Sequence, residues 1–158
     1  MEYIIRKIEE KDNQKIEKII RDCLIEFGGN HEGTAWADPN LSHLYDSYQE
    51  EGNCYFVVES NGEVIAGAGV KRIEIAGYCE IQKMYCMKEY RGNGIGKALM
   101  NKALEYAKKY YDYCYLESMD SMTVARSMYQ KMGFEKLDEP IVDTGHYGCN
   151  NKYLKRIK

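Results

Sequence analysis

The sequence predicts an α/β fold, with one mixed central sheet and helices on both of its faces. Two observations predict it. Strand-like and helical apolar patterns alternate along the 158 residues, in the order β-α-α-β-β-β-α-β-α-β-β. Strands followed by crossover helices recur in that order, which implies such a layered sheet. No linker or repeat interrupts the chain, so residues 1–158 are expected to form a single domain.

The first third of the chain predicts one strand and two helices. Residues 3–8 mix β-branched and polar side chains, as a strand does. Asp12 suits an N-cap, and apolar residues recur behind it at helical spacing up to Phe27, where a Gly-Gly pair ends the run. After a loop, Asp38-Pro39 suits the start of a second helix. Its apolar face would carry Leu41, Leu44, Tyr45 and Tyr48.

Three strands are expected in the middle of the chain. Residues 54–59 form an apolar run, and Asn61-Gly62 is a hairpin signal that predicts a returning strand over residues 63–73. Gly67 and Gly69 are unusual inside a strand and indicate a bulge or a close approach to the backbone. Residues 80–87 are the next strand.

The last third alternates helices and strands. We expect helices over residues 94–110 and 121–132, with a short buried strand over residues 113–116 between them. Gly133 closes the second of these helices. Phe134 and residues 147–157 supply the final strands.

Composition excludes two classes of partner. The formal net charge is −3, and no stripe of lysine and arginine stands out, so nucleic acid is not an expected partner. No stretch approaches the roughly 20 apolar residues of a membrane span. The first residues lack the basic start and the long apolar run of a signal peptide, and a cytoplasmic location is expected.

The six cysteines indicate no metal site. They lie mostly within apolar runs and form no C-x-x-C pair, which favours small buried side chains in a reducing compartment. His146 and Cys149 stand three residues apart, but zinc needs three or four ligands and no second pair is evident. No metal is therefore expected.

A glycine-rich turn is the most informative motif. Arg91-Gly92-Asn93-Gly94-Ile95-Gly96-Lys97 follows an expected strand and opens an expected helix. The start of a helix carries unpaired N–H groups and a partial positive charge, and glycines let the backbone approach an anion closely. The turn therefore predicts a pyrophosphate-binding site. The alternative is a helix start softened by glycine that holds no ligand.

Two other nucleotide-binding loops do not match. The P-loop pattern needs a glycine at position 91 and a hydroxyl at position 98, where this chain has Arg91 and Ala98. The dinucleotide pattern G-x-G-x-x-G fails because the glycines are spaced G-x-G-x-G. That pattern also usually follows the first strand of its domain.

Two motifs resemble those of the GNAT superfamily of N-acetyltransferases. Arg91-x-x-Gly94-x-Gly96 is similar to its coenzyme A pyrophosphate loop, and residues 125–134 resemble its A-x-x-L-Y-x-x-x-G-F motif. The element order also matches, so the resemblance covers nearly the whole chain. Met122 stands where many members have an asparagine that often touches the cofactor, and Lys88 replaces a common proline.

The resemblance implies that acetyl-CoA is the cosubstrate. The backbone of Met84, Tyr85 and Cys86 would pair with its pantetheine arm, and the N–H of Cys86 would bond the thioester oxygen. Its pyrophosphate would be held by Arg91, Gly92, Asn93, Gly94, Ile95, Gly96 and Lys97. Strand alternation would place Glu80, Gln82, Met84 and Cys86 on one face unless a bulge intervenes.

Two residues match catalytic positions of the family. Glu80 matches a general base, which would act through water or with a raised pKa because a carboxylate is otherwise a weak base for an amine. An edge-of-sheet salt bridge is the alternative interpretation. Tyr129 matches the acid that protonates the leaving thiolate, and core packing is the alternative for it.

The acceptor of the acetyl group is expected to be an amine, either a small molecule or a protein amino group. Glu117 could anchor its cation or act as the base instead of Glu80. His31, Trp36 and His146 lie in regions that flank the acceptor site in this family, although a lone loop histidine is more often a surface residue. Loops form that pocket, so the sequence does not name the amine.

Two further functions stay open at this point. A non-catalytic acyl-CoA sensor would keep the glycine loop without a working base and acid. A plain nucleotide-binding module would bind ATP or NAD without a preference for coenzyme A. The 15 tyrosines would also allow a homodimer.

Overall fold

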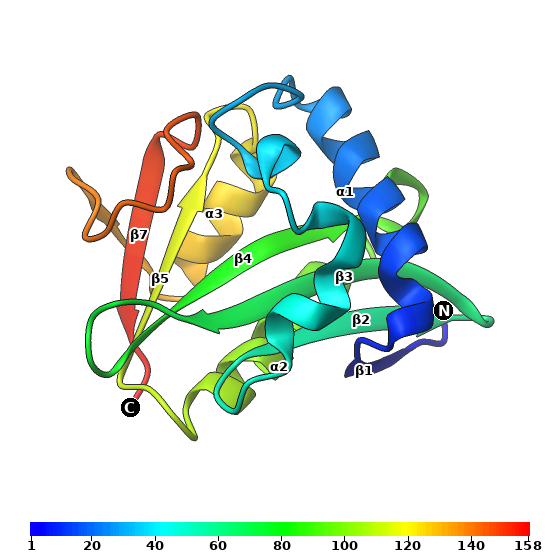
Figure 1. The fold of residues 1–158 in the computed structure, drawn as a ribbon, viewed down its shortest axis with the longest axis horizontal. Helices are drawn as coiled ribbons and strands as arrows, with labels where there is room; N and C mark the ends of the chain where they lie inside the picture. Colours follow the sequence, from blue (N-terminus) through cyan, green and yellow to red (C-terminus); the bar gives the residue numbers. More distant parts are fainter.

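The computed structural model describes residues 1–158 and contains one seven-stranded sheet (Figure 1). The strand order is β1-β2-β3-β4-β5-β7-β6, and every neighbouring pair is antiparallel except β4 and β5. The strands are β1 (Ile4–Lys7), β2 (Cys54–Ser60), β3 (Glu63–Arg72), β4 (Tyr78–Cys86), β5 (Tyr113–Ser118), β6 (Glu135–Leu137) and β7 (Asn151–Arg156). The mixed sheet confirms the expected fold class.

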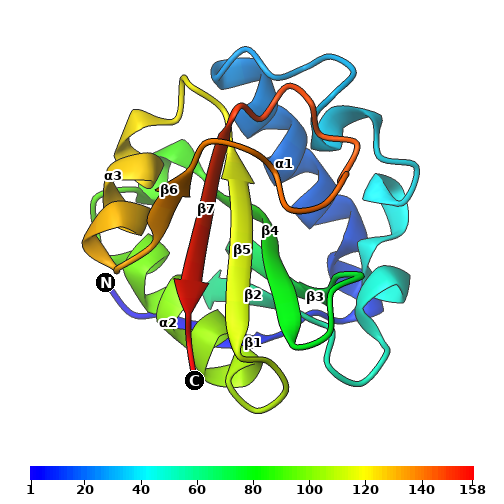
Figure 2. The ribbon, with the colours of Figure 1, turned by 90° about the vertical axis from the view of Figure 1, so that its left-hand side faces the viewer.

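Helices cover both faces of the sheet, as Figures 1 and 2 show. The helices are α1 (Asn13–Glu26), α2 (Ile95–Ala107) and α3 (Thr123–Lys131), with 3₁₀ segments η1 (Glu10–Asp12), η2 (Ala35–Ala37), η3 (Leu41–Tyr48) and η4 (Lys88–Tyr90). The apolar face of α1 packs with η3 against Tyr55 and Val57 of the sheet. On the opposite face, Leu99 of α2 packs against Ala68, and α3 contributes Tyr129 to the core.

The start of α1 differs in detail from the expected cap. Asp12 stands at the N-cap position, but its carboxylate makes no bond into the helix. It accepts hydrogen bonds from the Glu9 N–H (2.8 Å) and from both terminal nitrogens of Arg6 (2.8 and 3.0 Å). The Arg6 guanidinium and the Glu9 amide thus lower the pKa of this buried carboxyl, although burial alone would raise it. The Asp12 side chain thus joins β1 to the turn that precedes α1.

The second helix expected after Asp38-Pro39 is present as a 3₁₀ helix and not as an α-helix. Leu41–Tyr48 is 3₁₀ helix with non-helical dihedrals at His43, although Leu41, Leu44 and Tyr48 are buried as expected. Asp38 does not cap it, because its carboxylate pairs with the Lys83 ammonium at 2.6 Å and with His146. The Lys83 side chain is only 4% exposed, and a buried ammonium without a counter-ion would be costly.

The parallel strands β4 and β5 separate after a short contact. Their pairing covers three residue pairs and ends at Glu80 and Tyr115, whereas β4 continues to Cys86. On its other edge β4 pairs with β3 up to its last residue, Cys86. One edge of β4 is therefore without a strand partner beyond Glu80, which opens the sheet there.

A bulge in β4 changes which residues share a face. The register with β3 jumps from Gly69–Gln82 to Gly67–Tyr85, and Lys83 has a left-handed φ of 52°. A Cβ at Gly67 would come within 2.4 Å of the Tyr55 ring, so both of the features that the strand glycines indicated, a bulge and a close approach, are present.

One face was expected for Glu80, Gln82, Met84 and Cys86 unless a bulge intervened, and because the bulge is present these residues do not share a face. Gln82 lies on the α1 side of the sheet, where its side chain meets Glu80 and Tyr48. Met84 and Cys86 pack on the α2 side. Tyr85 packs on the α1 side.

Candidate active site

The glycine loop, residues 91–97, connects β4 to α2. Ala98 is the first residue of this region whose N–H donates within the helix, to Gly94 O at 3.1 Å. The N–H groups of residues 92–97 have no acceptor in the protein. They form a row of free donors at the positive end of a 13-residue helix, which is an arrangement suited to an anion.

The glycines of this loop have two roles. Gly92 and Gly94 have φ of 83° and 75°, which other residues rarely adopt. Gly96 has an ordinary φ, and a Cβ on it would point at Met128 Sδ (3.6 Å) and Met84 Cε (3.9 Å). Gly96 therefore leaves space between α2 and α3.

The Arg91 side chain holds the loop against α1. Its terminal nitrogens donate to the Glu26 carboxylate at 2.7 and 2.9 Å, and its Nε donates to Cys86 O at 3.0 Å. The guanidinium also lies 5.2 Å from the centre of the Phe27 ring. It lowers the pKa of the Glu26 carboxyl. These contacts position the loop, whereas the free backbone amides face outward.

A cavity of about 560 Å³ opens beside this loop, and we call it the glycine-loop cavity. The end of β4, the start of α2 and one side of α3 form most of its wall. They contribute Met84, Tyr85, Cys86, Gly96, Met128 and Tyr129. The wall is mainly apolar, with the free amides at its rim, which suits a long ligand with an anionic group. Asn93 is exposed at the turn, and Lys97 lines an adjoining groove.

The Cys86 N–H points toward the open edge of β4. Met87 N donates to Ile65 O at 2.9 Å, so Met87 is a hydrogen-bonded partner of β3. Bonding directions alternate along an antiparallel pair, so Cys86 directs its N–H and C=O away from β3. Its carbonyl accepts from Arg91 and Cys23. Its N–H lies on the edge that β5 has left.

Glu80 lies where β4 and β5 separate, and it is 5% exposed. Gln82 Nε2 donates to Glu80 Oε1 at 2.8 Å, and Tyr48 donates to Gln82 Oε1 at 2.5 Å, which fixes the amide. Burial, reinforced by the charge of Glu117, raises the pKa of Glu80 to about 7. Glu80 forms no ion pair, so the salt-bridge alternative for this residue is wrong.

Tyr129 is both a core residue and part of the cavity wall. Its ring packs edge-on against Phe134 and Tyr153, with centres 6.2 and 5.8 Å apart. Burial raises the pKa of its hydroxyl, which therefore stays protonated, and that hydroxyl makes no hydrogen bond within the protein. A free donor at this wall is compatible with an acid role, and the packing shows that the two interpretations do not exclude each other.

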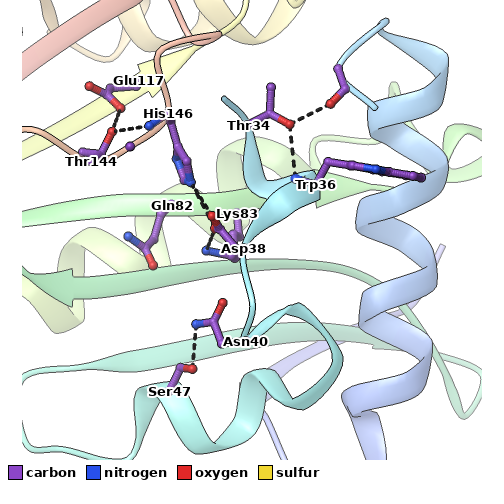
Figure 3. A network of polar contacts seen from close by, with 12 residues as sticks. Thr34, Trp36, Asp38, Asn40, Ser47, Gln82, Lys83, Glu117, Thr144 and His146 are labelled. Atoms are coloured by element: carbon purple, nitrogen blue, oxygen red, sulfur yellow. Dashed lines mark hydrogen bonds and ion pairs between the residues drawn. The ribbon is translucent and has the colours of Figure 1, made fainter. Parts of the chain in front are cut away.

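A second cavity, of about 480 Å³, lies under the loop between β6 and β7, and we call it the C-terminal cavity. Glu117, Thr144 and His146 line it (Figure 3). The Thr144 hydroxyl donates to Glu117 Oε1 and accepts from the His146 N–H at 3.2 Å. Tyr115 donates to Glu117 Oε2 at 2.7 Å.

His146 joins this loop to the other side of the site. Its Nε2 lies 2.9 and 3.0 Å from the two carboxylate oxygens of Asp38, which also pairs with Lys83 (Figure 3). Neutralisation by His146 and Lys83 lowers the pKa of Asp38 against the effect of burial. Three separate segments of chain thus meet at one carboxylate.

Trp36 and His31 lie outside the walls of both cavities. Trp36 packs against α1, where the Arg21 guanidinium lies 4.8 Å from its ring centre (Figure 3). His31 Nδ1 contacts the carbonyl of the next residue, Glu32, at 2.6 Å. Thr34 holds the segment between them through bonds to Gly29 O and the Trp36 N–H.

Sequence reasoning did not single out several residues of the site. Lys152 is one of them. It lines the C-terminal cavity together with Cys149, which the sequence suggested only as half of a metal-ligand pair. The nearby Cys149 thiol adds to the effect of burial in raising the pKa of Tyr85, so Cys149 lies between the two cavities. The pair Asp38–Lys83 spans 45 positions of sequence, and no local pattern indicates it. Lys152 stands directly opposite Glu117 on β7, a register that only the structure shows.

No group of three or more His, Cys, Asp or Glu side chains is arranged to hold a metal ion. None of the helices has the length and apolar character that crossing a membrane requires.

Comparisons with known proteins agree with this geometry. A model of the acetyltransferase (GNAT) family matches residues 14–134. The chain is 35% identical over 158 residues to the uncharacterized N-acetyltransferase YjgM of Escherichia coli strain K12, covering 98% of this chain and 95% of that protein.

Two solved structures share the fold. The acetyltransferase of the GNAT family from Staphylococcus aureus Mu50 has a TM-score of 0.88 at 22% identity, covering 99% of this chain and all (100%) of that one. The PaiA N-acetyltransferase from Thermoplasma acidophilum, in complex with coenzyme A, has a TM-score of 0.77 at 21% identity, covering 99% of both chains.

The mixed sheet that opens between two parallel strands places this chain in the fold class of these solved acetyltransferases. The family match then gives the assignment within that class. This chain belongs to the GNAT family of N-acetyltransferases, and the resemblance of its sequence motifs to that family is confirmed.

Proposed function

We propose that this protein transfers the acetyl group of acetyl-CoA directly to the nitrogen of an amine, and that residues 1–158 act as one domain. The row of free N–H groups at residues 92–97, beside an apolar cavity that reaches Tyr129, carries this proposal. It suits a ligand with a pyrophosphate and a long arm.

The chain would hold the cosubstrate at two places. The free amides of the glycine loop would bind the pyrophosphate, and Met84, Tyr85 and Cys86 would lie along the pantetheine arm. The Cys86 N–H, on the open edge of β4, would donate to the thioester oxygen and stabilise the negative charge that develops there.

Proton transfer would involve the two matched residues. Glu80, through a water molecule, would accept the proton that the ammonium of the acceptor must lose before its nitrogen attacks the carbonyl. A carboxyl with a pKa near 7 is a better base than an ordinary one. As the carbon–sulfur bond breaks, Tyr129 would donate its proton to the departing sulfur and later regain one from solvent.

Calorimetric titration with acetyl-CoA tests the proposal, with ATP and NAD as controls. We expect binding in the micromolar range for acetyl-CoA and at least 100-fold weaker binding for the two controls, a difference of roughly 2.7 kcal/mol. Equal binding of ATP would favour a nucleotide-binding module. Binding of acetyl-CoA without acetylation of any amine in a broad screen would favour the sensor.

We expect Tyr129→Phe to lower kcat by about 100-fold, the lower end of the usual effect of general acid catalysis. The dissociation constant for acetyl-CoA should change less than threefold, because the ring still packs against Phe134 and Tyr153. Steady-state kinetics and calorimetry measure the two quantities. An unchanged kcat would show that the thiolate leaves without protonation and that Tyr129 serves packing alone.

A further inference from the structure

Three charged side chains of the C-terminal cavity form no ion pair: the carboxylates of Glu117 and Asp143 and the ammonium of Lys152. Both oxygens of Glu117 accept hydrogen bonds from neutral hydroxyls, those of Tyr115 and Thr144, and no cation pairs with the carboxylate. Each carboxylate oxygen has a second lone pair and can accept another donor. Glu117 is therefore held in place with its charge uncompensated.

Lys152 is the cation of this cavity. It stands directly opposite Glu117 in the antiparallel pair of β5 and β7, so both side chains lie on the same face of the sheet. The Lys152 ammonium donates only to the carbonyl of Asn150, at 3.2 Å, and forms no ion pair. Two opposite charges thus line one cavity without pairing with each other.

The neighbouring charged residues are arranged differently. Asp38, on the same side of the site, is compensated by the Lys83 ammonium at 2.6 Å and also lies 2.9 Å from the His146 ring nitrogen. Those contacts fix the loop that carries His146, and they leave no charge for a ligand. The charges without an ion pair are those of Glu117, Lys152 and Asp143. Asp143 is exposed and accepts the Gly145 N–H, so Glu117 is the partly buried anion of the cavity.

The remaining wall suits a small molecule. Pro140, Ile141 and Val142 give the cavity an apolar side, and its volume of about 480 Å³ accommodates an amino acid with a large side chain. Glu117 also contributes to the raised pKa of Glu80, which places the uncompensated anion near the proposed base.

We propose that the acceptor is a zwitterionic amine, an α-amino acid or a short peptide, whose ammonium binds Glu117 and whose carboxylate binds Lys152. This inference rests on the proposed function and adds the class of acceptor. The apolar residues of the loop would contact the side chain of the acceptor. The amine would then lie near Glu117 and Glu80, at the end of the cavity that Cys149 lines, from which its nitrogen would reach the thioester.

The experiment measures kcat/KM for matched sets of three acceptors. Each set contains an amino acid, its amide and its decarboxylated amine. The ammonium of the amide is more acidic than that of the amino acid, and the ammonium of the decarboxylated amine is less acidic. The amino acid is therefore intermediate, and a dependence of kcat/KM on amine acidity alone could not make it the best of the three acceptors. For the wild type we expect kcat/KM for the amino acid to exceed both others by at least tenfold.

Lys152→Met tests the residue. It should abolish that preference, mainly through a higher KM for the amino acid, and leave kcat/KM for the amide and the decarboxylated amine within twofold. The matched control is Lys136→Met, an exposed lysine of β6 outside both cavities, which should keep the preference.

Three outcomes would overturn the inference. They are a wild type that prefers the decarboxylated amines, a Lys152→Met variant that keeps the preference, and a variant that loses activity equally on all three acceptors. Each of these leaves acetylation itself intact and so leaves the proposed function standing. Failure to bind acetyl-CoA would instead contradict the proposed function.

Discussion

Glu80→Gln is expected to lower kcat by a factor of 10² to 10⁴, the range of general base catalysis, and to leave the dissociation constant for acetyl-CoA within threefold. The glutamine is nearly the same shape, and its amide oxygen can still accept the bond from Gln82 Nε2. Glu80 is not in the wall of the glycine-loop cavity, so cosubstrate binding should not depend on it.

The pH dependence of the wild type provides a second test of the same residue. The base must be ionised to accept a proton, and its pKa is raised to about 7 by burial and by Glu117. The acid limb of kcat/KM should therefore rise with unit slope and reach half of its maximum near pH 7. Glu80→Gln should lack that limb.

Glu80→Gln should raise the free energy of unfolding, although it lowers kcat. The carboxyl is protonated in both folded and unfolded protein below its ordinary pKa of 4.5, and ionisation costs folding free energy increasingly as the pH rises from 4.5 to about 7. At 1.36 kcal/mol per pKa unit, Glu80→Gln should be more stable than the wild type by up to about 3 kcal/mol at pH 8, and by little near pH 4.

Urea denaturation at both pH values measures this difference. Glu135→Gln, at an exposed position of β6, is the matched control and should alter neither activity nor stability. A Glu80→Gln variant that retains more than a tenth of wild-type kcat would exclude Glu80 as the base and direct attention to Glu117. A variant that is less stable at pH 8 would instead indicate that the carboxylate is a structural element.

Local features of this protein could be predicted from the sequence. The apolar spacing of α1, the hairpin at Asn61-Gly62 and the glycine loop each depend on residues within one or two turns of chain. Gly67 and Gly69 indicated a bulge or a close approach, and the structure has both, because the missing side chains leave room for Tyr55 and Tyr48.

The bulge position and the polar network could not be predicted in the same way. Nothing in the local sequence marks Lys83 for a left-handed φ, yet that one residue reverses the faces of Met84 and Cys86. His146 and Asp38 are 108 positions apart, and only the fold brings them together. The same long-range pairing removed Asp38 from the capping role that its neighbours in sequence suggested.

The second large effect is expected at Gly96, where the size of the substituted side chain should determine the affinity for acetyl-CoA. A Cβ there lies in ordinary contact with Met128 and Met84, so Gly96→Ala should fit and should stabilise α2 by up to about 1 kcal/mol, because alanine favours a helix. The atoms beyond Cβ in Gly96→Phe would extend toward those methionines and fill the glycine-loop cavity.

For Gly96→Phe we therefore expect the dissociation constant for acetyl-CoA to rise at least 100-fold, which is about 2.7 kcal/mol, while Gly96→Ala stays within threefold of the wild type. Calorimetry measures both constants, and thermal unfolding shows whether the folds are intact. The loss should appear in binding rather than in folding, because the new ring enters a cavity instead of the packed core. Tight binding by a folded Gly96→Phe variant would show that the cosubstrate does not pass between α2 and α3, and the proposed roles of Cys86 and Tyr129 would fail with it.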